Sequence, residues 1–118
     1  MDLMPLHRID HVSLDVADRT RSIAWYETVL GARAARRSCP PDEPVFIGPT
    51  GARLGLFAER APGLRHIALA TDGDGQRGVV HRLERLAIPY RREHHSDHDS
   101  VYFADPDGNT LEVMVARA

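Results

Sequence analysis

The chain has 118 residues, of which 42% are apolar and 27% charged, so it can form one globular domain with a buried core. Its 15 basic residues nearly balance its 17 acidic ones, and the net charge of −2 argues against nucleic-acid or membrane-surface partners. Every basic residue is an arginine, which excludes a Schiff-base lysine and a phosphate-binding P-loop.

No leader-like segment and no long apolar run are present, so we expect a cytoplasmic protein without a membrane span. The single cysteine, Cys39, excludes an intrachain disulfide and a zinc site made of several cysteines. The sequence instead has seven histidines, the side chain that most often binds metals and transfers protons near neutral pH. Their positions in the predicted elements decide which of them matter.

The chain contains one internal repeat. Residues 9–14 (IDHVSL) match residues 64–69 (LRHIAL) at an offset of 55, and residues 46–56 match residues 103–113 at an offset of 57. Two matches in the same order at nearly equal offsets predict two copies of one structural unit. We place these copies, modules 1 and 2, at about residues 7–59 and 64–117 of a single domain spanning 1–118.

Module 1 begins with a strand, since apolar and polar residues alternate from Val12 to Val16. A helix follows, with Asp18 as its N-cap and Gly31 just past its end. Three more strands are predicted at 33–38, 45–48 and 53–59.

Module 2 repeats this order. After a strand at 64–71, the helical spacing of Val79, Leu83 and Leu86 predicts a helix that ends before Pro89. Three strands are again predicted, at 89–93, 100–105 and 109–116. Each module is therefore βαβββ, and the fold class is α+β.

The alternation along the strands also assigns side chains to faces. Apolar neighbours take the side that a helix covers, so His11, His66 and Glu112 fall on the opposite face of three different strands. Tyr102 joins them, because Val101 takes the helix side. Two histidines and one carboxylate are typical of a metal site with open coordination positions.

A symmetric site would have a fourth ligand, and the repeat shows that it is missing. The counterpart of Glu112 in module 1 is Gly55. The nearest acid, Glu59, lies four residues further along the chain. An even spacing keeps it on the same face, so a shift of the strand could bring it to the missing position.

The repeat, the three candidate ligands and the motifs around them resemble those of the vicinal-oxygen-chelate superfamily. This superfamily includes glyoxalase I, bleomycin-resistance proteins, extradiol dioxygenases and fosfomycin-resistance proteins. The resemblance extends from residues 9–12 through 25–31 and 65–68 to 102–112. It implies paired βαβββ modules that form open, curved mixed sheets with the helices on the outer face. It also implies that His11, His66 and Glu112 bind one divalent ion, which the ligand set leaves open as Fe, Mn, Zn, Ni or Co.

The departures from the family patterns distinguish its subgroups. Gly55 stands where glyoxalase I has a glutamate that acts in proton transfer, so true glyoxalase I activity is disfavoured. Only Arg117 follows Glu112 as a basic residue, which argues against a fosfomycin-type thiol transferase. A histidine, His94 or His95, precedes Val101-Tyr102 and the segment 105–112 as in the extradiol signature, although the residues before it do not fit.

We therefore expect a metal-dependent enzyme, dioxygenase-like or lyase-like, acting on a small substrate that chelates the ion through adjacent oxygens. Tyr102 and His95 are the candidate catalytic residues. The alternative is a non-catalytic, bleomycin-resistance-like binding protein, which does not need all three ligands. The polar segment 93–99 has two interpretations: a solvated loop with an exposed His98, or a loop whose histidine enters the cavity as an acid or base.

We also expect a homodimer in which His11 of one chain completes a site with His66 and Glu112 of its partner. The resemblance implies this exchange, because short members of the superfamily mostly pair their modules between chains. Apolar residues that we place on the non-helix face would add a hydrophobic driving force. These residues are Val45, Ile47, Phe57 and Met114.

Overall fold

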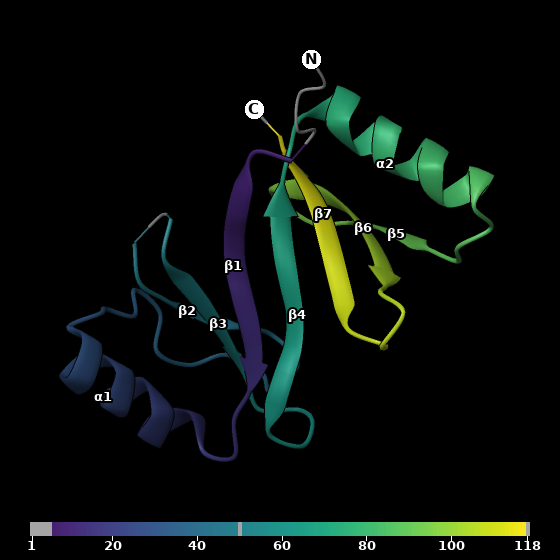
Figure 1. Ribbon diagram of the computed structural model, residues 1–118. Helices are drawn as coiled ribbons and strands as arrows, with labels where there is room; N and C mark the ends of the chain where they lie inside the picture. The colour runs from purple at the N-terminus through teal and green to yellow at the C-terminus, as the bar shows by residue number, and fades with distance from the viewer. Residues whose placement is uncertain (1–5, 50, 118) are drawn as a thin grey trace. The chain divides into compact units, whose positions relative to one another are not determined.

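The structure is a computed structural model that describes residues 6–49 and 51–117. Over these residues the fold is α+β, with two helices and seven strands (Figure 1). In chain order the elements are β1 Arg8–Asp15, α1 Arg19–Leu30, β2 Val45–Ile47, β3 Arg53–Phe57, β4 Gly63–Ala70, α2 Gly73–Arg85, β5 Arg91–His94, β6 His98–Ala104 and β7 Thr110–Ala116. Neither of these two helices has the length and apolar character needed to cross a bilayer.

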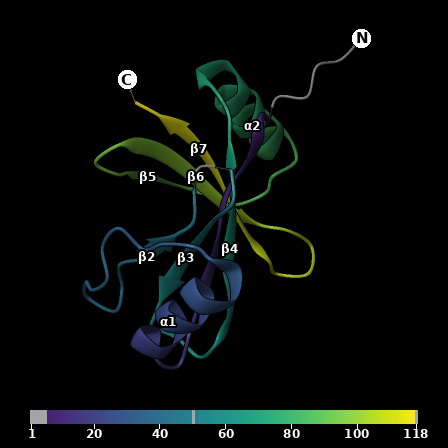
Figure 2. The ribbon, with the colours of Figure 1, turned by 90° about the vertical axis from the view of Figure 1, so that its left-hand side faces the viewer.

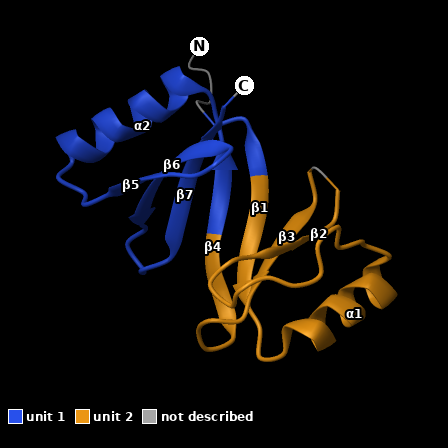
Figure 3. Ribbon diagram, turned by 180° about the vertical axis from the view of Figure 1, so that it is seen from behind, with its two compact units in different colours: residues 1–9, 67–118 blue, residues 10–66 orange. Residues whose placement is uncertain are grey.

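The chain divides into two compact units (Figure 3). Unit 2 comprises residues 10–66, and unit 1 comprises residues 1–9 and 67–118. In unit 2 the strand order is β2-β3-β1, with β1 parallel and β2 antiparallel to β3. Strand β4 begins in unit 2 and continues from Ile67 in unit 1. In unit 1 the strand order is β4-β7-β6-β5, with β4 parallel and β6 antiparallel to β7. The matching pattern of partners confirms the predicted repeat.

Strand register supports the predicted equivalence of Gly55 and Glu112. Ser13 of β1 lies opposite Gly55 of β3, and Ala68 of β4 lies opposite Glu112 of β7. Since Ser13 and Ala68 are equivalent in the repeat, their partners are equivalent too. The chain therefore has one carboxylate where a symmetric molecule would have two.

Helix α1 begins and ends where the sequence predicts. The Arg21 N–H donates to the Asp18 carboxylate at 3.0 Å, and Gly31 closes the helix in a left-handed conformation with φ 67°. Ile23 is 1% exposed and packs against residues of β2 and β3. This contact holds α1 on one face of the unit 2 strands (Figures 1 and 2).

Helix α2 has a matching role in unit 1. Its N-cap Asp72 accepts the Gly75 N–H at 2.8 Å, and Leu83 packs with Val101 of β6. The helix ends before Pro89, as predicted, and its C-cap residue Leu86 is 63% exposed.

The strand predicted at 33–38 is wrong. Only Ala34 forms a bridge, to Ile47, and no ladder continues from it. The rest of this connection is held by a side chain, since the Arg19 guanidinium donates to the carbonyls of Cys39, Pro40 and Glu43. One charged group with several donors thus replaces a row of strand hydrogen bonds.

The predicted placement of Val45 and Ile47 on the face away from the helices is also wrong. Both pack with Ile23 of α1. The cause is a one-residue difference in register: Phe46 lies opposite Gly55, whereas Tyr102 lies opposite Glu112. Phe46 is therefore equivalent to Tyr102 rather than to Phe103. A shift of one residue moves every side chain of a strand to the other face.

Candidate metal centre

Two of the predicted ligands lie side by side in unit 2. His11 comes from β1 and His66 from β4, and they are only 5% and 9% exposed. Their Nε2 atoms are 3.4 Å apart. Two nitrogens that bind one tetrahedral ion at about 2.05 Å would be about 3.3 Å apart. The spacing of the pair therefore fits joint coordination of a transition metal.

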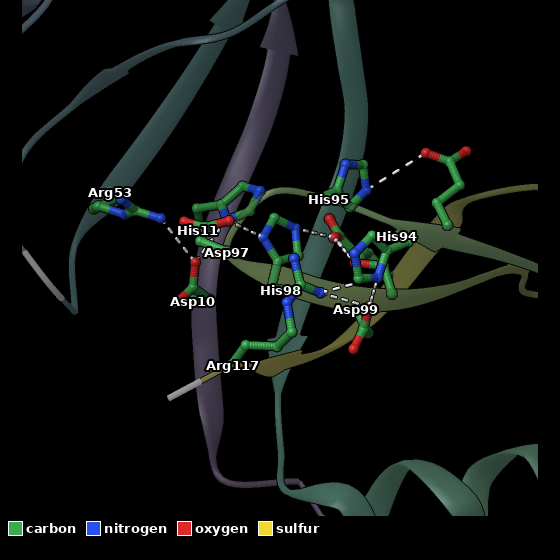
Figure 4. A network of polar contacts seen from close by, with 12 residues as sticks. Asp10, His11, Arg53, His94, His95, Asp97, His98, Asp99 and Arg117 are labelled. Atoms are coloured by element: carbon green, nitrogen blue, oxygen red, sulfur yellow. Dashed lines mark hydrogen bonds and ion pairs between the residues drawn. The ribbon is translucent and has the colours of Figure 1, made fainter.

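A partly buried carboxylate orients His11. Its Nδ1 lies 2.7 Å from Asp10 Oδ2, which also accepts a hydrogen bond from Arg53 at 3.0 Å (Figure 4). Burial acts to raise the pKa of Asp10, but the hydrogen bonds with His11 and Arg53 outweigh it and hold the pKa below its ordinary value. Because Nδ1 is engaged, Nε2 is the ring nitrogen available to a metal.

Ser13 and two aromatic rings surround the histidine pair. Ser13 is fully buried, with its Oγ 3.1 Å from His66 Nε2. The Phe46 ring lies 5.1 Å from the His11 ring, and the Phe57 ring lies 6.4 Å from the His66 ring. The histidine pair is thus removed from water, which strengthens electrostatic interactions there.

The position of the missing fourth ligand is occupied by other side chains. A Cβ added at Gly55 would lie 3.0 Å from Phe46 Cε1 and 3.1 Å from Ser13 Oγ, so a larger residue would displace them. Glu59 does not replace the ligand, because its carboxylate pairs with Arg65 at 3.0 Å and is 39% exposed. Within the described residues of unit 2, no carboxylate stands at the place equivalent to Glu112.

Glu112, the third predicted ligand, lies in unit 1. It is 1% exposed, and the Ser100 hydroxyl donates to its Oε2 at 2.5 Å. His98 Nε2 lies 3.3 Å from the same oxygen. The structure thus pairs His11 with His66 in one unit and Glu112 with His98 in the other. The site that combines His11, His66 and Glu112 stays a prediction.

The two candidate catalytic residues contact each other in unit 1. His95 Nε2 lies 3.1 Å from the hydroxyl of Tyr102. Burial, together with the nearby charge of Glu112, raises the pKa of Tyr102. The phenol therefore stays protonated and can donate a hydrogen bond.

The segment 93–99 is not simply a solvated loop, and the expectation of an exposed His98 is wrong. His98 begins β6, its side chain is 20% exposed, and its Nδ1 lies 2.5 Å from Asp97 (Figure 4). The hydrogen bond with Glu112 raises the pKa of His98. His98 was not among the site residues predicted from the sequence. Its spacing of two and four residues from Ser100 and Tyr102 puts all three on one face of β6, and this spacing could have indicated its position.

His94 belongs to a different surface. Its Nδ1 lies 2.6 Å from Asp99, whose carboxylate also accepts a hydrogen bond from Arg117 (Figure 4). The His94 side chain is 76% exposed. The sequence did not decide whether His94 or His95 precedes Tyr102 in the extradiol-like pattern. Of these two, His95 is the one that contacts Tyr102.

The comparisons with known proteins agree with this fold. A family model described as a glyoxalase-like domain matches residues 11–114. The metallothiol transferase FosB of Lysinibacillus sphaericus is 28% identical over 119 residues, covering 92% of this chain and 82% of the relative. The catechol-2,3-dioxygenase of Bacillus subtilis is 25% identical over 121 residues, covering 92% of this chain but 41% of the relative.

Solved structures show the same architecture. Methylmalonyl-CoA epimerase from Mycobacterium tuberculosis superposes with a TM-score of 0.79 at 17% identity, covering 100% of this chain and 93% of its own. A catechol 2,3-dioxygenase gives 0.78 at 16% identity, covering 97% of this chain and 40% of its own. With the repeat, the registers and the family match over residues 11–114, the chain belongs to the glyoxalase-like domain family within the vicinal-oxygen-chelate superfamily.

Proposed function

We propose that this protein is a divalent-metal-dependent enzyme whose small substrate chelates the ion through two adjacent oxygens. The observation that carries the proposal is the buried pair His11 and His66, with Nε2 atoms 3.4 Å apart. Two imidazoles this close and this buried leave little room for solvent between them. A cation bound by both nitrogens would account for two buried imidazoles at this separation.

The proposed ligands are His11, His66 and Glu112. Imidazole nitrogens and a carboxylate suit Fe, Mn, Zn, Ni or Co, and three protein ligands leave positions for substrate. When bound, the metal would supply Lewis acidity, or an oxygen-binding site if it is Fe(II). Asp10 fixes the ring of His11, and Ser100 holds the carboxylate of Glu112.

Tyr102 and His95 are the proposed proton donors and acceptors. The protonated phenol of Tyr102 would donate a hydrogen bond to a substrate oxygen, which stabilises negative charge that develops there. His95, 3.1 Å from that hydroxyl and 33% exposed, would exchange a proton between the site and solvent.

The reaction we favour is dioxygenase-like or lyase-like. Because position 55 is a glycine, this chain lacks the acidic residue that serves as the base in a glyoxalase I reaction. The dioxygenase relative and the extradiol-like spacing of His95, Tyr102 and Glu112 support ring cleavage. The relative FosB supports thiol transfer as a second candidate. Metal-free binding of a drug-like molecule is the non-enzymatic alternative.

The test begins with the metal content of the purified protein. The metal-free chain is then loaded separately with Fe(II), Mn(II) and Zn(II). It is offered a catechol with O₂, or fosfomycin with a low-molecular-weight thiol, and product is followed. We expect metal-dependent turnover that His66→Ala abolishes and His94→Ala preserves, since His94 lies on another surface. Binding of substrate-like molecules without metal, and no turnover with any ion, would favour the non-enzymatic alternative.

We also propose a homodimer with sites shared between chains, as the resemblance implies. Because the Nε2 atoms of His11 and His66 lie 3.4 Å apart within one chain, the shared site would combine this pair with Glu112 of the partner subunit, rather than take His11 alone from a second chain. The apolar residues first assigned to its interface do not support it, because Phe57 and Met114 are 7% and 8% exposed within one chain. Ile9 and Leu64 are better candidates. They occupy equivalent positions in the repeat, share the parity of His11 and His66, and are 55% and 51% exposed.

A further inference from the structure

We propose that unit 1 contains a second cation site, formed by His95, His98 and Glu112. Each of the three offers one ligand atom, and these atoms lie within 4.8 Å of one another. The site uses no residue of unit 2. It therefore goes beyond the proposed function and does not depend on the histidine pair of that unit.

The geometry of His98 is that of a metal ligand held by a neighbouring carboxylate. Its Nδ1 lies 2.5 Å from Asp97, and its Nε2 lies 3.3 Å from Glu112 Oε2. A carboxylate on one ring nitrogen fixes the tautomer and turns the other nitrogen toward the metal. Asp10 does the same for His11 in unit 2. A separation of about 3.3 Å also suits two ligands that bind one ion at about 2.1 Å.

The hairpin between β5 and β6 brings His95 beside His98. The His95 N–H donates to the His98 carbonyl at 2.9 Å, across a connection of two residues. Residues that face each other in this way place their side chains next to one another. The two imidazole rings are stacked, with centroids 4.5 Å apart and planes 24° apart. His95 would leave its contact with Tyr102 to bind the ion.

Burial and access also fit a cation site. Glu112 supplies a side chain that is 2% exposed, while those of His95 and His98 are 33% and 20% exposed. The carboxylate is thus removed from water, and the histidines border the solvent from which an ion would enter. Glu93 Oε1, 3.4 Å from His95 Nε2, adds negative charge at this edge.

Glu112 belongs to both proposed ligand sets. Because one carboxylate belongs to both ligand sets, we propose the two sets as alternative positions for an ion. The ligand set of unit 1 is two nitrogens and one oxygen, for which Zn²⁺ is the fitting probe.

The experiment titrates the full-length, metal-free chain with Zn²⁺ against a chromophoric chelator. The double variant His11→Ala/His66→Ala is expected to retain one Zn²⁺ per chain. Adding His98→Ala to this double variant is expected to weaken binding at least tenfold. Adding His94→Ala, a neighbouring histidine on another surface, is the matched control and should change the affinity less than twofold.

A second readout covers variants that fold poorly. In the His11→Ala/His66→Ala chain, the imidazole NMR signals of His95 and His98 should shift on adding Zn²⁺, while those of His94 should not. Loss of all Zn²⁺ binding in a folded His11→Ala/His66→Ala chain would overturn the proposal. Equal affinity with and without His98, or unmoved His95 and His98 signals, would overturn it as well.

Discussion

Buried polar residues identify the functional face of this chain. In β1, His11, Ser13 and Asp15 are 5%, 0% and 4% exposed, while Leu14 between them packs against the core cluster that contains Ile23 of α1. Buried polar side chains are costly unless they are paired, and those here have hydrogen-bonding partners. Of the two faces of β1, the polar one is therefore the more completely buried, as expected of a strand that positions ligands.

The joint metal site of His11, His66 and Glu112 stays a prediction, but all three side chains are buried. Alternation in the sequence singled them out, because apolar neighbours mark the helix side. It missed Phe46 and His98. A one-residue difference in hairpin length moved Phe46 to the site face, and a histidine among polar residues carries no burial signal until its partner, here Glu112, is known.

Asp10 should control metal affinity without binding the metal. Asp10→Ala removes the carboxylate that orients His11, so we expect metal affinity to fall about 10- to 100-fold. Competitive Zn²⁺ titration measures the change. Asp42→Ala, at an exposed position, is the control. An Asp10 variant with unchanged affinity would show that the ring of His11 is held by other contacts.

At the scale of elements, helix ends were predicted best. Asp18 and Gly31 define both ends of α1 through local hydrogen bonds and backbone conformation, which a short sequence window contains. The strand predicted at 33–38 failed for the opposite reason. The guanidinium of Arg19, far from it in sequence, holds the connection by its carbonyls, and no local pattern reports such a contact.

Arg19 should therefore decide whether the connection between α1 and β2 stays ordered. Its guanidinium donates to the backbone carbonyl of Glu43 at 2.6 Å and to the backbone carbonyl of Leu56 in β3 at 3.1 Å. Arg19→Ala should lower the free energy of unfolding by about 1.5–3 kcal/mol, the range for hydrogen bonds to a charged group. Urea denaturation measures this loss.

Hydrogen exchange locates the same effect. Amides of residues 39–44 should exchange faster in the Arg19→Ala chain, whereas those of β6 and β7 should not change. Arg19→Lys should not restore the wild-type rates, because an ammonium group cannot reach several carbonyls with a planar fork of donors. Full protection in either variant would remove the role given to Arg19.

For the whole molecule, the repeat explains why one chain has an uneven set of ligands. Both copies supply a histidine, but only the second supplies a carboxylate, since Gly55 stands at the equivalent position of the first. The sequence contained this asymmetry, and the strand registers bear it out. Whether one chain or two build each site depends on how modules pair, which alternation within a strand does not encode.

Mixing of variants tests the shared-site dimer. His11→Ala chains and Glu112→Ala chains, both also carrying His98→Ala to silence the unit 1 site, are combined under conditions that permit subunit exchange. If the His11–His66 pair of one chain completes a site with Glu112 of the partner subunit, the heterodimer regains one intact site. Zn²⁺ binding should then partly return. No recovery, with exchange verified by mass spectrometry, would assign each site to a single chain.

The most direct test of the metal centre is a crystal structure of the Zn²⁺-loaded protein, with the ion located by its anomalous scattering. We predict one ion at about 2.0–2.2 Å from His11 Nε2, His66 Nε2 and a carboxylate oxygen of Glu112, whichever chains contribute them. A fully loaded crystal with no ion on His11 and His66, or His11 and His66 separated from Glu112 by more than about 6 Å in every pairing of chains, would contradict this assignment of the metal centre.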